Sequence, residues 1–211
     1  VLGSRGLGDV YKRQVIHMEI GATKAVQDRL KTTKIEESKG ASLVFCWDTH
    51  LTKIKGRNVL FIVNASNRYT IAMTDIEPRN LNYYTMYIRS VIHGVMQEMG
   101  YSENQIGQYF KMSGDTTVTK THGRKSVGGI NRMVMDAQYF GKKLEKEAKY
   151  QWELSEYLNR YICQPEGFDA YGYPSELFKL DMERLGIAAK RKPAKVIDFT
   201  KYIDTNRSTN Y

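Results

Sequence analysis

Three neighbouring segments of the chain have the composition of β-strands and leave room only for tight turns between them. They are residues 42–54, 57–65 and 68–76, all rich in Val, Ile, Phe, Tyr and Thr. The short linkers contain Gly56 and Asn67, residues that are typical of turns. Because connections this short join only antiparallel neighbours, we predict a three-stranded meander. The run "VLFIV" in its middle segment is apolar on both faces, as in a strand covered on both sides.

Helical periodicity dominates most of the remaining chain. Apolar residues recur at helical spacing between residues 81 and 99, and "SENQ" at 102–105 has the form of a capping box. The same reasoning predicts short strands at 18–20 and 115–122 and further helices, over residues 22–30, 127–144, 152–162 and 175–186. The sequence therefore predicts a single α+β domain, with an antiparallel sheet of four or five strands around the meander, flanked by helices.

The first 17 residues, here called the leader, carry glycines that resemble a phosphate-binding loop. Such a loop must follow a strand and open a helix, and "SRGLGDVYKRQ" does neither. The leader also resembles the translated adapter sequence found at the ends of assembled contigs. We therefore expect residues 1–17 to be non-native and Met18 to be the natural start, with the domain itself spanning residues 18–186.

Residues 187–211, here called the tail, are polar and basic. Of the formal net charge of +9, the leader holds +2 and the tail +4, which leaves +3 for residues 18–186. The domain is thus only mildly basic, which weakens the case for a dedicated DNA-binding face. Four cations within 190–195 predict a disordered tail that makes weak, salt-sensitive contact with nucleic acid.

Two features of the sequence indicate the compartment in which the protein is found. No apolar run approaches the roughly 20 residues that span a bilayer, so we expect no membrane partner. Cys46 and Cys163 stand alone, which is typical of a protein from a reducing compartment. We therefore expect a cytoplasmic protein.

Motifs for catalysis or for a cofactor are absent from the sequence. There is no HExxH, CxxC or GxSxG, and "HGRKS" at 122–126 lacks two residues of a phosphate-binding loop, so we expect no cofactor. Strand alternation places Asp48 and His50 on one face, where they would suit a pair of metal ligands, but no third ligand is evident. The simpler interpretation is an exposed polar edge after Trp47, nearly neutral for stability.

Two polar clusters are the candidate ligand-binding groups. One lies at the predicted strand-to-strand turn and the other at the predicted strand-to-helix junction. If the two lie together, their cations and backbone N–H groups would hold an anion such as phosphate. Alternatively, turn chemistry explains the asparagines and Arg68 is a surface charge. The residues are Asn64, Asn67 and Arg68 in the first cluster, and Lys120, His122, Arg124 and Lys125 in the second.

Four stretches carry a resemblance to a known family: "MEIGATKAVQDRL", "FCWDTHL", "NVLFIVNASNRYTI" and "TVTKTHGRKSVGGINR". In this order they are similar to an uncharacterised prokaryotic family, which occurs alone and as the N-terminal domain of plasmid open-reading-frame-three-type proteins. The resemblance covers residues 18–162, and Asp48 stands where that family usually has His. It implies a prokaryotic or mobile-element origin and a compact α+β fold, and it implies no activity.

From these features we predict a non-enzymatic binding or accessory module of a mobile element, with a protein or nucleic-acid partner. The alternative is a metal-dependent enzyme acting on phosphate esters or nucleic acid. It would use the cations of Arg68, Lys120 and Arg124 with Asp48 and His50 as the metal pair. An enzyme requires these groups to converge in one pocket, whereas a binding module does not.

Overall fold

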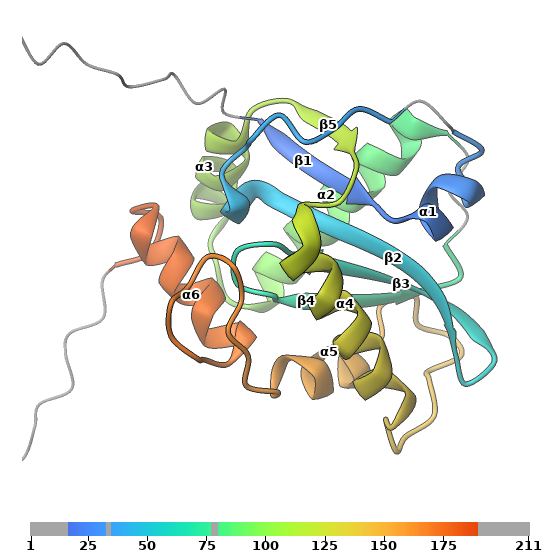
Figure 1. The fold of residues 1–211 in the computed structure, drawn as a ribbon. Helices are drawn as coiled ribbons and strands as arrows, with labels where there is room; N and C mark the ends of the chain where they lie inside the picture. The colour runs from blue at the N-terminus through green and yellow to red at the C-terminus, as the bar shows by residue number, and fades with distance from the viewer. Residues whose placement is uncertain (1–16, 33–34, 77–79, 190–211) are drawn as a thin grey trace, which may run out of the picture.

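A computed structural model of the protein describes residues 17–32, 35–76 and 80–189. All of the leader except His17 lies outside the described residues. Of the tail over residues 187–211, predicted to be disordered, only residues 187–189 are described, and Ile187 is buried. The described residues form one five-stranded sheet in the order β4-β3-β2-β1-β5 (Figure 1). The strands are β1 (Met18–Ala22), β2 (Cys46–Ile54), β3 (Arg57–Asn64), β4 (Thr70–Thr74) and β5 (Thr116–Thr119).

The sheet is mixed, so the prediction of a purely antiparallel sheet was wrong. The meander itself is confirmed, because β2 pairs antiparallel with β3 and β3 pairs antiparallel with β4. Strand β1 instead runs parallel to both of its neighbours, β2 and β5. Parallel pairing requires a long crossover connection. The chain connects β1 to β2 through a helix and a long loop, and β1 to β5 through the meander and two further helices.

Six α-helices accompany the sheet in the described part of the chain. The capping box is confirmed, since the Ser102 hydroxyl accepts from the Gln105 N–H and the Gln105 side chain accepts from the Ser102 N–H. None of the described helices combines the length and apolarity needed to cross a membrane. The helices are α1 (Lys24–Arg29), α2 (Leu81–Glu98), α3 (Glu103–Ser113), α4 (Gly123–Gln138), α5 (Trp152–Asn159) and α6 (Pro174–Arg184), and Leu43–Phe45 forms a short 3-10 helix rather than a strand.

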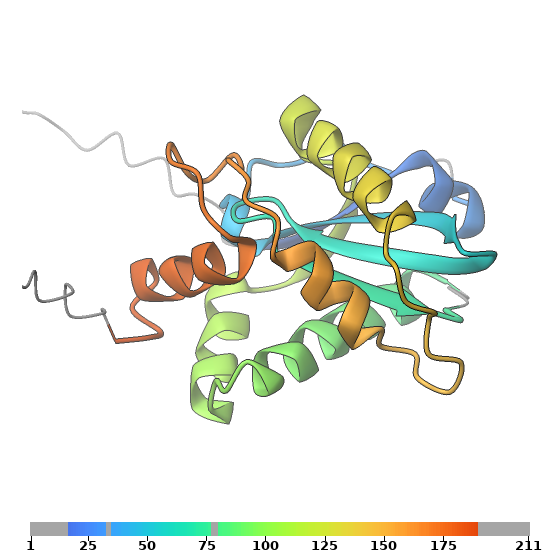
Figure 2. The same ribbon diagram turned by 90° about the horizontal axis from the view of Figure 1, so that it is seen from below.

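Helices cover both faces of the sheet (Figure 2). Leu60 and Ile62 of β3 pack into a core shared with α2, α3 and α6, whereas Phe61 and Val63 pack on the other face against α4 and α5. The prediction that this strand is covered on both sides is therefore confirmed. The apolar core of the second face covers β3, β4 and the end of β2 at Ile54. The other half of this face, over β1 and the rest of β2, carries polar side chains beneath the start of α4, and we call it the polar half-face.

Candidate functional site

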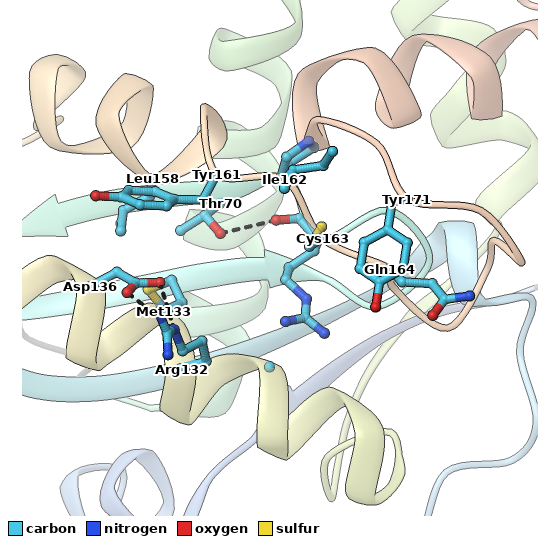
Figure 3. Close-up of a pocket in the computed structure, with 13 residues that line it drawn as sticks. Thr70, Arg132, Met133, Asp136, Leu158, Tyr161, Ile162, Cys163, Gln164 and Tyr171 are labelled. Carbon is cyan, nitrogen blue, oxygen red and sulfur yellow. Dashed lines mark hydrogen bonds and ion pairs between the residues drawn. The ribbon is translucent and has the colours of Figure 1, made fainter.

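A cleft of about 300 Å³ lies beside α4, near the turn that joins β3 to β4 (Figure 3). Arg68 occupies that turn with a positive φ of 62°, and its guanidinium lies against Gly129 of α4. A Cβ added to Gly129 would come within 2.3 Å of the Arg68 Cζ, so the glycine makes room for the arginine. The cleft is further lined by Arg132, Tyr161, Cys163, Gln164 and Tyr171.

The Arg68 guanidinium has no hydrogen-bond acceptor and no carboxylate partner among the described residues. Its neighbour Arg132 differs, because its Nε lies 3.2 Å from a carboxylate oxygen of Asp136. A guanidinium carries five N–H donors, which are usually paired when the group is withdrawn from water. Arg68 therefore offers the cleft an open set of donors and a positive charge.

The other predicted ligand-binding residues do not gather in this cleft. The side-chain oxygen of Asn64 accepts from the backbone N–H groups of Ser66 and Asn67, and the Asn67 amide donates to Asp181 at 2.8 Å. These buried asparagine side chains are occupied in shaping the turn. A ligand at Arg68 would meet the guanidinium and not their amides.

The second predicted cluster is divided between the surface and the interior. Lys120 pairs with Glu37 on the surface, Arg124 is exposed, and the Lys125 ammonium donates to the Pro165 carbonyl at 3.1 Å. His122 is instead buried. The structure thus does not bring the seven residues into one pocket.

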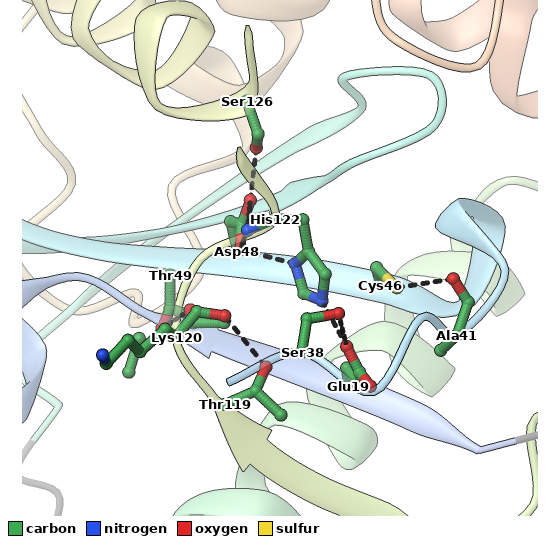
Figure 4. A network of polar contacts seen from close by, with 12 residues as sticks. Glu19, Ser38, Ala41, Cys46, Asp48, Thr49, Thr119, Lys120, His122 and Ser126 are labelled. Carbon is green, nitrogen blue, oxygen red and sulfur yellow. Dashed lines mark hydrogen bonds and ion pairs between the residues drawn. The ribbon is translucent and has the colours of Figure 1, made fainter. Parts of the chain in front are cut away.

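The polar half-face holds a buried network centred on His122 (Figure 4). The ring Nδ1 lies 2.8 Å from Asp48 Oδ1, and Nε2 lies 2.9 Å from Glu19 Oε2. Burial by itself would lower the pKa of His122, but the hydrogen bond to Asp48 opposes it, and the pKa rises to about 11. The ring is therefore an imidazolium held between two carboxylates, a charge-assisted arrangement.

Both carboxylates accept further hydrogen bonds from neighbouring groups. Ser38 Oγ donates to Glu19 at 2.5 Å and the Lys39 N–H donates to it at 2.7 Å. Burial would raise the pKa of Glu19, but these hydrogen bonds outweigh it and lower the pKa to about 2. The Ser126 hydroxyl donates to Asp48. Glu19 Oε1 also lies 2.6 Å from Nε2 of His17, which is the one residue of the leader that the structure describes.

The structure both confirms and corrects the interpretation of Asp48 and His50. They lie on one face of β2, as alternation predicts, since they pair with Val63 and Phe61, which share one face of β3. The expectation of an exposed edge was wrong for Asp48, whose side chain is 0% exposed. His50 lies apart from the network, with Nδ1 3.2 Å from Thr23 Oγ1, and burial lowers its pKa.

Sequence reasoning missed Glu19, Cys46 and Ser126 as members of this network. The available signal was a charged residue inside a short apolar strand, "MEIGA". A buried carboxylate requires a partner, so Glu19 indicates a polar cluster under α4. A second signal was Gly21, which sits in the same strand although glycine weakens strands.

Replacing Gly21 with alanine is expected to destabilise the protein by about 1–3 kcal/mol, the usual cost of overpacking. The new Cβ would lie 1.8 Å from Asp48 Oδ1 and 3.1 Å from His122 Nδ1, so the network would have to move. Urea denaturation followed by circular dichroism measures the change. Gly94→Ala in α2 is the matched control, because nothing lies within 4 Å of its Cβ. A Gly21→Ala protein as stable as the wild type would contradict this geometry.

The fold and the site together define an α+β domain of three layers, in which Ser126 of α4 contacts the polar network and Gly129, about one turn further along the helix, contacts Arg68 in the cleft. The chain belongs to the DUF6933 family, a domain of unknown function whose family model matches residues 19–177. Comparison with curated proteins and with solved structures gave no match. The family assignment confirms the resemblance to an uncharacterised domain and assigns no activity.

Proposed function

We propose that the protein is a non-enzymatic binding module that holds single-stranded nucleic acid in the cleft beside α4. The observation that carries this proposal is the Arg68 guanidinium, which lies in the cleft without an acceptor among the described residues. A phosphate oxygen is the natural partner of an open guanidinium, because it accepts two parallel N–H bonds and carries the opposite charge.

Exposed tyrosines beside the guanidinium favour nucleic acid over an acidic protein segment. The side chains of Tyr161 and Tyr171 lie on opposite sides of the cleft, and they are 41% and 70% exposed (Figure 3). Aromatic rings next to cations are typical of surfaces that bind single strands, where bases stack on the rings and phosphates contact the cations. Arg132 also lines the cleft, but it is paired with Asp136, so among the described residues of the cleft Arg68 is the cation that remains open to a ligand.

We further propose that the protein has an accessory role in a prokaryotic mobile element. This part is supported by the resemblance of the sequence motifs to plasmid-encoded proteins. The basic tail would add sequence-independent contacts with phosphates. The enzyme alternative has less support, since Asp48 is occupied by His122 and Ser126, and Lys120 and Arg124 are exposed and do not line the cleft of Arg68.

Arg68→Gln is expected to weaken binding of a fluorescently labelled single-stranded oligonucleotide by about 10-fold or more. The reason is the loss of a charge-assisted hydrogen bond, which contributes about 1.5–3 kcal/mol. Fluorescence anisotropy at several salt concentrations measures the affinity, and the slope of log K against log salt should fall by about 0.7.

Arg124→Gln is the matched control, because it removes the same charge from an exposed position on the first turn of α4. It should change the affinity much less than Arg68→Gln does. Equal losses in the two variants would mean that binding follows general charge and not the cleft. Unchanged binding by Arg68→Gln would reject the proposed contact.

A further inference from the structure

An oxygen, a sulfur and a nitrogen atom that could bind a metal lie close together on the polar half-face. A carboxylate oxygen of Glu19, the sulfur of Cys46 and a ring nitrogen of His122 lie within 4.8 Å of one another. All three residues are buried, with 0%, 0% and 7% of their surface exposed. They come from β1, from β2 and from the residue that precedes α4, so three separate elements fix their positions.

The orientation of His122 is the one found in metal sites. Its Nδ1 is held by Asp48 at 2.8 Å, which directs Nε2 toward Glu19 (Figure 4). Histidines that bind metals usually donate the other ring N–H to a carboxylate in this way, which fixes the tautomer and the ring plane. Asp48 is fixed in turn by the Ser126 hydroxyl and by the backbone N–H of His122.

Cys46 contributes a sulfur whose present contacts are weak. Its Sγ lies 3.4 Å from the Ser42 carbonyl oxygen and 3.7 Å from the Ala41 carbonyl oxygen. A thiol is a poor hydrogen-bond donor, so little is lost if the sulfur exchanges these contacts for a metal bond. Glu19 and Cys46 are register partners on adjacent parallel strands, which places their side chains next to each other on this face.

We propose that Glu19, Cys46 and His122 bind one divalent zinc-like ion through one oxygen, one sulfur and one nitrogen. This donor set suits zinc, and three protein ligands leave a fourth position for water. Binding displaces the Cys46 thiol proton and the proton on His122 Nε2 to solvent, and the ion takes their place. Asp48 is a positioning residue that acts through His122. The inference goes beyond nucleic-acid binding and does not depend on Arg68.

Cobalt binding to the purified full-length protein tests the site directly. After treatment with a chelator, the wild type should bind one Co²⁺ per chain, with the near-ultraviolet absorption of a thiolate–cobalt bond. Cys46→Ser should lose this absorption. Cys163→Ser should keep it, because the other cysteine of the chain lies in the cleft and not in the network. Failure of the wild type to bind cobalt or zinc at micromolar concentrations would overturn the proposal, and so would absorption that persists in Cys46→Ser.

A second measurement needs no variant and keeps the test valid if Cys46→Ser does not fold. X-ray absorption at the zinc edge of the wild-type complex should show one sulfur at about 2.3 Å together with oxygen and nitrogen ligands. A shell without sulfur, or with two sulfurs, would reject the site. Asp48→Asn should weaken zinc binding by about 10–100-fold in competition with a chelating dye, while the thiolate–cobalt absorption remains. An unchanged affinity would remove Asp48 from its positioning role.

Discussion

His122→Ala is expected to lower the free energy of unfolding by about 3–5 kcal/mol, the cost of breaking a buried ion pair by removing one partner. The variant leaves Glu19 and Asp48 buried, both 0% exposed, without the cation that lies between them. Urea denaturation at pH 7 measures the loss. His93→Ala is the control, since its ring is 38% exposed and faces Glu103 at the surface, and it should cost less than about 1 kcal/mol.

The pH dependence of stability separates the charge of His122 from its packing. The folded-state pKa of His122, raised to about 11, lies above the ordinary value of 6.5. Its contribution is therefore complete below pH 6.5 and is lost progressively as the pH rises toward 11. Wild-type stability should fall between pH 7 and 9, and the profile of His122→Ala should be flatter over this range. Parallel profiles would mean that the ring is neutral in the folded protein.

Trp47→Ala is expected to cost about 3–5 kcal/mol through the cavity that it leaves in the core on the opposite face of β2. Trp47 is 1% exposed, and its indole N–H donates to the Tyr109 hydroxyl at 2.9 Å. The centroid of its ring lies 6.2 Å from that of the Phe178 ring. The hydroxyl of Tyr109 would lose one of its two partners, which adds to the cost. Denaturation followed by circular dichroism gives the value.

The second tryptophan of the chain provides the matched control. Trp152 begins α5 and is 44% exposed, so Trp152→Ala should change stability by much less than Trp47→Ala. Similar losses for both tryptophans would contradict the placement of Trp47 in the core. The prediction that Trp47 is buried came from the alternation in β2, and the structure confirms it.

The parts of the fold that depend on local sequence could be predicted. Short turns required the antiparallel meander, and apolar spacing and capping residues located the helices. The parallel pairs of β1 could not be predicted, because Met18 pairs with Thr116 and no local pattern records that distant contact. Local patterns also placed Leu43–Phe45 in the strand, although the backbone makes a 3-10 turn there.

The candidate site was harder to predict, because its members come from separate elements. Alternation placed Asp48 and His50 on one face but did not reveal that α4 covers it. Arg68 was correctly placed at a turn, yet only the structure brings its guanidinium against Gly129. Glycine inside a helix has an energetic cost, and in α4 the space at Gly129 is filled by the Arg68 guanidinium, whereas nothing lies within 4 Å of a Cβ added to Gly128.

The mixed sheet has a consequence for the order in which the chain assembles during synthesis. Strand β1 is synthesised before the other described strands, and it pairs on one side with β2 and on the other with β5, which is made only after the meander and two helices. The hairpins of β2, β3 and β4 close short loops and can form early, whereas the β1–β5 pair closes a long one and comes late. Until β5 arrives, β1 has a free edge open to other nascent chains. The sheet is therefore completed last at its first strand, when β5 covers that edge.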